Sequence, residues 1–218
     1  MSTWTERELA CACGQTIHAR VAVGAHVGRA PQVRTAILER SFHRFACGCG
    51  AAVVLDTQFE YFDLDRRQLV LVGAASDREA WPDLERRLRD TVLRALEWGS
   101  PLTSDLVARL VPRVVFGLEA LREKLILADA GLDDGLIECV KIRAIANDPE
   151  LSRGRMRIEA VTSGDALHVR HEARSDVFEL PASWVHAALH DRASLENRFP
   201  ALFGGGYVDL ARFWKESA

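Results

Sequence analysis

The sequence of 218 residues lacks the usual features of membrane proteins and of general nucleic-acid-binding proteins. No apolar run approaches the roughly 20 residues of a membrane-spanning helix. The formal net charge is −3, so the chain has no basic excess of the kind that general nucleic-acid binders carry. Residues 1–8 contain neither the apolar core nor the cleavage site of a signal peptide. We therefore expect a soluble globular protein of the cytoplasm that does not act at a membrane.

The familiar sequence patterns of catalysis and nucleotide binding are also missing. No serine lies in a nucleophile-elbow sequence, and the glycines 204–206 are not followed by the Lys-Ser/Thr of a phosphate-binding loop. His186 and His190 have the spacing of metal ligands on one helix face, but Ala187 stands where a metalloprotease helix carries its glutamate. We interpret this pair as surface histidines without a third ligand, and we assign no catalytic residue.

Cysteine is scarce, but four of the five cysteines follow one pattern: Cys11-Ala12-Cys13-Gly14 and Cys47-Gly48-Cys49-Gly50. Residues i and i+2 of an extended segment project from the same face, so both sulfurs of each pair can turn toward one ion. Glycine after each pair permits the positive φ of a tight turn whose backbone N–H groups would face the sulfurs. Four thiolates form the closed tetrahedral ligand set of structural zinc. We therefore predict one structural zinc ion bound by Cys11, Cys13, Cys47 and Cys49.

Other uses of these thiols stay open from the sequence alone. Four soft ligands could instead hold Cu(I) or an iron–sulfur cluster. Two disulfides would need an oxidising compartment, and a disulfide between residues two apart is strained. The fifth cysteine, Cys139, lies in a helical stretch and is expected to be a small buried apolar residue.

Between and after the two cysteine knuckles lie further short motifs: Pro31-Gln32-Val33-Arg34, Ile37-Leu38-Glu39, Ser41-Phe42-His43-Arg44-Phe45 and Tyr61-Phe62-Asp63. Together with the knuckles, and in this order, they resemble the CpXC domain over about residues 9–72. That bacterial and archaeal family is named for its paired cysteine motifs and has no assigned activity. Its usual knuckle is Cys-Pro-x-Cys, whereas both knuckles here lack the proline and are one residue shorter. The resemblance implies zinc binding and no particular reaction.

The first third of the chain alternates apolar and polar residues, a pattern that predicts strands. A loop at 63–67 separates two of these strands as a hairpin. We assign a small antiparallel, zinc-ribbon-like sheet to a domain of residues 1–80. A sheet of this size buries little apolar surface, so the metal is expected to contribute much of its stability. The predicted strands are 15–23, 51–55, 58–62 and 68–72.

Residues 81–218 are expected to form a second, α+β domain. No linker marks the boundary near residue 80, so the two parts could pack as one body. The whole chain is therefore assigned to the α+β class, with the antiparallel ribbon followed by a helical layer and by a C-terminal antiparallel hairpin with a helix. Periodicity and capping signals predict helices at 81–98, from 101 to a stop at Pro112, at 118–128 and at 134–147, strands at 155–161, 166–170 and 177–180, and a helix at 181–190.

Charge is uneven along the first domain. From Arg20 to Arg44 there are five arginines against one acid, Glu39, a net of +4. These arginines could bind a phosphate backbone or an acidic partner, or they could be neutralised by the metal site and by the acidic hairpin that follows. We interpret that hairpin, with Asp56, Glu60, Asp63 and Asp65, as a solvated turn region. The candidate binding residues are Arg29, Arg34, Arg40 and Arg44.

Three functions are consistent with the sequence. The first is a zinc-stabilised adaptor that recognises a protein partner through the ribbon or the helical layer. The second is a nucleic-acid-binding zinc ribbon that uses residues 20–44, and the third is an enzyme whose site the sequence does not reveal. We favour the first, because few aromatic residues are interleaved with the arginines. Salt-dependent binding to DNA or RNA would distinguish the second.

Overall fold

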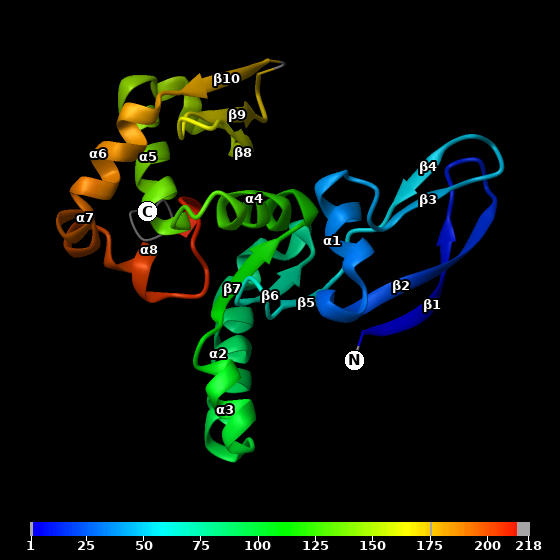
Figure 1. Ribbon diagram of the computed structural model, residues 1–218. Coiled ribbons are helices and arrows are strands. Elements are labelled where there is room, and N and C mark those ends of the chain that lie inside the picture. Colours follow the sequence, from blue (N-terminus) through cyan, green and yellow to red (C-terminus); the bar gives the residue numbers. More distant parts are fainter. Residues whose placement is uncertain (1, 175, 213–218) are drawn as a thin grey trace. The chain divides into compact units, whose positions relative to one another are not determined.

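The computed structural model describes residues 2–174 and 176–212 (Figure 1). Contacts divide the chain into two compact units, Met1–Leu121 and Arg122–Ala218. This division lies beyond the boundary expected near residue 80, because strand β7 (Val111–Phe116) pairs with strand β6 (Gln68–Gly73). The hydrogen bonds of that pairing join residues on both sides of position 80 into one unit.

The first unit is built on a five-stranded sheet with the order β1-β2-β5-β6-β7. The β1–β2 and β5–β6 pairs are antiparallel, whereas the β2–β5 and β6–β7 pairs are parallel. The sheet is thus mixed where the sequence predicted an antiparallel one, because alternation identifies strands but not their relative directions. The remaining strands of this sheet are β1 (Thr3–Ala10), β2 (Thr16–His26) and β5 (Phe59–Asp63).

Pro112 lies within strand β7, so the prediction that it ends a helix is wrong. Helix α3 (Pro101–Val107) stops before it. Strand β7 is at the edge of the sheet, where a residue without an N–H group is tolerated, and Pro112 is opposite Leu69 of β6. The proline hid this strand in the sequence, since proline is rare inside sheets.

The second knuckle lies in a separate two-stranded hairpin, formed by β3 (Arg44–Ala46) and β4 (Ala52–Val54). The chain reaches this hairpin through a short 3-10 turn (Val27–Arg29) and helix α1 (Pro31–Leu38), which begins at the proline of the sequence motif. In Figure 1 the turn of the β3–β4 hairpin lies beside the turn that joins β1 to β2. Both cysteine pairs are therefore carried by hairpin turns.

An aromatic contact attaches the β3–β4 hairpin to the five-stranded sheet. Phe42 and His43 stack with 4.0 Å between ring centroids, and His43 meets Phe59 of β5 edge-on at 5.5 Å. The Nε2 atom of His43 accepts a hydrogen bond from the backbone N–H of Ala22 in β2 at 3.1 Å. His43 is buried, so this bond holds a neutral ring between the hairpin and the sheet.

Helix α2 (Trp81–Trp98) has the bounds that the sequence predicted and follows a 3-10 turn at Ala75–Ala80. Its N-terminal half buries Leu84 and Leu88. Helix α3 then packs beside α2 (Figure 1). The hydroxyl of Ser100 accepts a hydrogen bond from the N–H of Thr103 at 3.2 Å and so caps the start of α3.

The second unit combines helices with a three-stranded antiparallel sheet of order β10-β9-β8. The carboxylate of Asp133 accepts hydrogen bonds from the N–H groups of Gly135 and Leu136 and so caps helix α5, which begins at Asp134. Cys139 is buried in α5, as expected. Helix α4 (Leu118–Asp129) spans the division between the units. The other elements are α5 (Asp134–Asn147), a 3-10 turn (Pro149–Arg153), β8 (Met156–Val161), β9 (Leu167–His171), β10 (Val177–Leu180), α6 (Ala182–His190), α7 (Arg192–Arg198) and α8 (Pro200–Gly204).

The core of the second unit lies between α5 and the sheet. Ile137 and Val140 of α5 belong to the same buried cluster as Ile158 of β8 and Val169 of β9. The predicted C-terminal hairpin, third strand and helix are therefore confirmed as parts of one core. Across the described residues, no helix is both long and apolar enough to cross a membrane.

We predict that His43 destabilises the first unit as the solution is acidified. Burial lowers the pKa of His43 from 6.5 to about 4. Between these two pH values the unfolded chain takes up a proton that the folded protein does not, so the free energy of unfolding falls as pH falls. We expect a loss of roughly 2 kcal/mol over this interval.

The matched variant is His43→Gln, which keeps an oxygen that can accept from Ala22 and cannot titrate in this range. Urea unfolding of both proteins between pH 6.5 and 4, at equal metal content, measures the dependence. The free energy of unfolding should fall less steeply with pH in the variant than in the unmodified protein. Equal pH dependence in the two proteins would contradict the prediction.

Candidate metal centre

The two knuckles have the same backbone geometry. In the first, the N–H of Gly14 donates to the carbonyl of Cys11 at 2.9 Å, and in the second the N–H of Gly50 donates to the carbonyl of Cys47 at 2.9 Å. Gly14 and Gly50 have φ values of 87° and 88°, in the left-handed region that favours glycine. Both copies of the Cys-x-Cys-Gly sequence therefore form the same type of turn.

The two turns bring all four thiols together. Their sulfur atoms lie within 4.8 Å of one another. The sulfurs of Cys11 and Cys49 are 3.8 Å apart, and those of Cys13 and Cys47 are 3.7 Å apart. A tetrahedral ion with metal–sulfur bonds of about 2.3 Å requires sulfur–sulfur edges of about 3.8 Å. All four cysteines are free thiols, so the donor set and its spacing fit a four-coordinate metal.

The backbone supplies hydrogen-bond donors to this sulfur cluster. The N–H groups of Gln15, Cys49 and Ala51 interact with the sulfurs of Cys13, Cys47 and Cys49, respectively. The Ala51 N–H and then the neighbouring thiols lower the pKa of Cys49 to about 7, so this thiol ionises near neutral pH. Four thiolates around a divalent ion carry a formal charge of −2, which these N–H dipoles stabilise.

The two cysteines of each knuckle differ in their exposure to solvent. The first cysteines, Cys11 and Cys47, are buried, whereas the second, Cys13 and Cys49, are exposed. The side chain of Gln15 lies against the cluster, with its Oε1 atom 3.0 Å from the sulfur of Cys47. The sequence motifs do not single out Gln15. Its signal is its place directly after the first Cys-x-Cys-Gly, where the second knuckle has Ala51.

Ion pairs direct two of the four candidate arginines toward different acidic residues. Arg40 forms a bidentate pair with Glu119, with both N···O distances 2.9 Å. Arg34 lies 3.8 Å from the carboxylate of Asp63. Arg29 and Arg44 are exposed. Two of the four arginines are therefore engaged by acids of the first unit.

Asp63 corrects one sequence interpretation. It is buried, whereas Asp56, Glu60 and Asp65 are exposed as expected for a solvated turn region. The carboxylate of Asp63 accepts hydrogen bonds from the hydroxyl of Tyr61 at 3.3 Å and the N–H of Arg66 at 3.2 Å. It thus has a structural role in the β5–β6 hairpin.

His186 and His190 of α6 do not belong to a group of metal ligands in the part of the chain that the structure describes. His186 Nε2 lies 3.1 Å from the carboxylate of Asp165. Within residues 2–174 and 176–212, the four cysteines are the one group of three or more His, Cys, Asp or Glu side chains placed to share an ion.

We predict that each chain binds one metal ion through these thiols. The double variant Cys11→Ser/Cys47→Ser removes one buried ligand from each knuckle and should bind none, as measured by elemental analysis of the purified protein. It should also melt at a lower temperature, because the free energy of metal binding contributes to folding. Cys139→Ala, which changes the cysteine of α5, is the control and should keep the metal. Metal retained by the double variant would contradict the assignment.

The knuckle glycines generate a second prediction. An alanine side chain at position 14 or 50 would meet no atom within 4 Å, so the φ angle alone opposes the substitution. Gly14→Ala and Gly50→Ala should each cost about 1–2 kcal/mol and weaken metal binding roughly five- to thirtyfold in a competition titration with a chelator. Gly164→Ala is the matched control, since its surroundings are equally open and its φ is not positive. Equal affinities in all three variants would show that the turn geometry does not limit metal binding.

Comparison with known families agrees with this site. The model of the family described as CpXC protein matches residues 9–141. The match includes both knuckles and extends past the 9–72 stretch of the sequence resemblance, through β7 and α4 into α5. Comparisons with curated proteins and with solved structures give no match. Because the matched residues make up more than half of the 218-residue chain, this protein belongs to the CpXC protein family.

Proposed function

We propose that this chain is a zinc-stabilised binding protein that recognises a protein partner. Zinc is supported by the spacing of the thiols, since sulfurs that all lie within 4.8 Å of one another leave room for a single ion and not for a cluster. Four cysteine ligands complete a tetrahedral shell, so the ion would hold the two knuckles together without an open position for a substrate. The metal would therefore support a binding surface elsewhere in the unit.

The observation that carries this proposal is an exposed set of apolar side chains on helices α2 and α3. Four of the eight large apolar residues that are exposed in the described chain lie within residues 93–106. Trp98 is 84% exposed and Leu93 is 45% exposed. Exposed apolar surface marks interaction sites, and tryptophan is enriched among the residues that dominate binding energy. We call this set the α2–α3 apolar surface; it comprises Leu93, Leu96, Trp98 and Leu106.

The charges around this surface favour a protein over a phosphate-bearing partner. Helix α2 carries four arginines and four acidic residues, so its formal charge is zero. A surface for nucleic acid or for an anionic membrane needs a basic excess. An apolar surface with charges of both signs around it instead resembles the core and rim of a protein–protein interface.

The nucleic-acid alternative has weaker support. It would use Arg29, Arg34, Arg40 and Arg44, but Arg34 and Arg40 already face Asp63 and Glu119. Releasing an arginine from such a pair would reduce the gain from a phosphate contact. Arg29 and Arg44, which are both exposed, remain as candidates of that set.

We predict that the α2–α3 apolar surface is needed for partner binding. The full chain is used to isolate a partner from its native host, and the purified partner is then titrated against variants. Trp98→Ala should weaken binding by about 2 kcal/mol, or roughly thirtyfold, and Leu93→Asp by at least tenfold. Both residues are exposed, so the melting temperature and the metal content should not change.

The matched control is the double variant Arg29→Ala/Arg44→Ala, which changes exposed residues outside this surface and should bind the partner as the unmodified chain does. The opposite pattern, with binding lost in the arginine variant and kept in Trp98→Ala, would overturn the proposal. Salt-sensitive retention on DNA or RNA that is lost in Arg29→Ala/Arg34→Ala/Arg40→Ala would establish the nucleic-acid alternative.

A further inference from the structure

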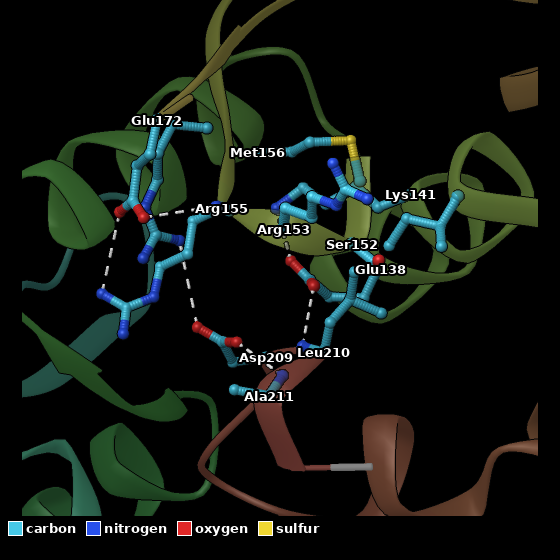
Figure 2. Close-up of a pocket in the computed structure, with 13 residues that line it drawn as sticks. Glu138, Lys141, Ser152, Arg153, Arg155, Met156, Glu172, Asp209, Leu210 and Ala211 are labelled. Atoms are coloured by element: carbon cyan, nitrogen blue, oxygen red, sulfur yellow. Dashed lines mark hydrogen bonds and ion pairs between the residues drawn. The ribbon is translucent and has the colours of Figure 1, made fainter. Parts of the chain in front are cut away.

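The second unit contains a cavity of about 310 Å³ that the metal centre does not use. Its lining comes from α5, from the turn and strand at 152–157, and from residues 209–211. Figure 2 shows the carboxylate of Asp209 between a side of the pocket formed by Arg155 and Glu172 and a side formed by Glu138 and Lys141. A cavity of this volume suits a small molecule.

Buried charges lie along the inner wall of the pocket and behind it. Lys141 is fully buried, and its Nζ atom donates to the carboxylates of Glu123 and of Glu138, the latter at 2.7 Å. Arg157 donates to the other oxygen of Glu123 at 2.9 Å. The second oxygen of Glu138 accepts from the N–H of Leu210 at 3.0 Å. These contacts fix the positions of the charged groups before any ligand binds.

The buried charges beside the pocket alternate in sign. The carboxylates of Glu123, Glu138 and Asp209 face the cations Lys141 and Arg157. Of these carboxylates, Glu138 and Asp209 line the pocket. Burial raises the pKa of Glu138, and the carboxylate of Asp209 adds to this effect. A cation placed between the carboxylates of Glu138 and Asp209 would offset both of these effects and would therefore be stabilised there.

Asp209 is placed to receive such a cation. Its Oδ1 atom accepts from the N–H of Ala211 at 2.9 Å. Its Oδ2 atom is 3.9 Å from Arg157, beyond hydrogen-bond distance, and thus keeps acceptor capacity. On the other side of the pocket, Arg155 lies 3.8 Å from Glu172, so its guanidinium keeps donor capacity. The pocket therefore presents an acceptor and a cationic donor to one small volume.

We propose that this pocket binds a free α-amino acid. The ammonium group would lie between Asp209 and Glu138, and the carboxylate would face Arg155, which can bind it in a bidentate manner. Ile145 and Met156 also line the cavity and would contact the side chain of the ligand. A ligand with both charges matches the two sides of the pocket, whereas an amine or an acid alone matches one. This inference concerns the second unit and is independent of the partner proposed for α2 and α3.

The test uses the full metal-loaded chain and the twenty proteinogenic amino acids, each added singly in a thermal-shift assay and then titrated by calorimetry. At least one should raise the melting temperature by about 2–4 °C at saturating concentration. The amine that lacks its carboxylate and the acid that lacks its ammonium group should each bind at least tenfold more weakly.

Variants locate the site. Asp209→Asn keeps an oxygen for the N–H of Ala211 and removes the charge, and it should weaken binding at least tenfold. Arg155→Gln should do the same, and because Arg155 is 42% exposed this change leaves the fold intact even if Asp209→Asn does not fold. Glu179→Gln removes an exposed carboxylate of β10 outside the pocket and should bind like the unmodified chain. The proposal is overturned if no amino acid binds, if the acid alone binds equally well, or if Arg155→Gln binds with unchanged affinity.

Discussion

The convergence of four thiols from two hairpin turns is the constraint on which the first unit depends. The knuckles belong to different sheets, and the strands of the β3–β4 hairpin have three residues each. A two-stranded hairpin of that length is not stable by itself in water. Its position relative to β1 and β2 is fixed at one end by the sulfur cluster and at the other by the buried contact of His43 with Ala22. Between these ends, Phe45 of β3 and Val53 of β4 pack against the buried cluster of Leu9, Ala19 and Val21 in β1 and β2. A small apolar cluster and two specific contacts therefore hold the ribbon together.

The two units are stabilised in different ways. The first combines a mixed sheet with the thiol cluster, whereas the second has an apolar core between α5 and a three-stranded sheet. Beside that core, Lys141 is buried between two glutamates. A buried ion pair contributes little net stability, because desolvation offsets the Coulomb attraction. Such a network is therefore easier to explain as a positioning device for the pocket that it lines.

In this protein the net charge of a sequence segment differs from the charge that the folded segment can offer to a ligand. The segment from Arg20 to Arg44 carries a net of +4 in the sequence, yet the structure directs Arg34 and Arg40 to Asp63 and Glu119. Glu119 lies far outside the segment, so a net charge counted over the segment does not include the carboxylate that neutralises Arg40. Conversely, the second unit contains a buried network of opposite charges that is assembled from residues as far apart as 123 and 209.

The sequence by itself determined which four cysteines cluster, the α+β class and the bounds of helix α2, because each depends on local spacing or periodicity. It determined the positive-φ turns at Gly14 and Gly50 for the same reason. Tertiary structure alone decided the parallel pairings of the sheet, the strand at Pro112 and the burial of Asp63. It also decided the charged pocket, whose lining comes from α5, residues 152–157, Glu172 and residues 209–211. These features arise from contacts between residues far apart in the chain, and local propensity carries no information about such contacts.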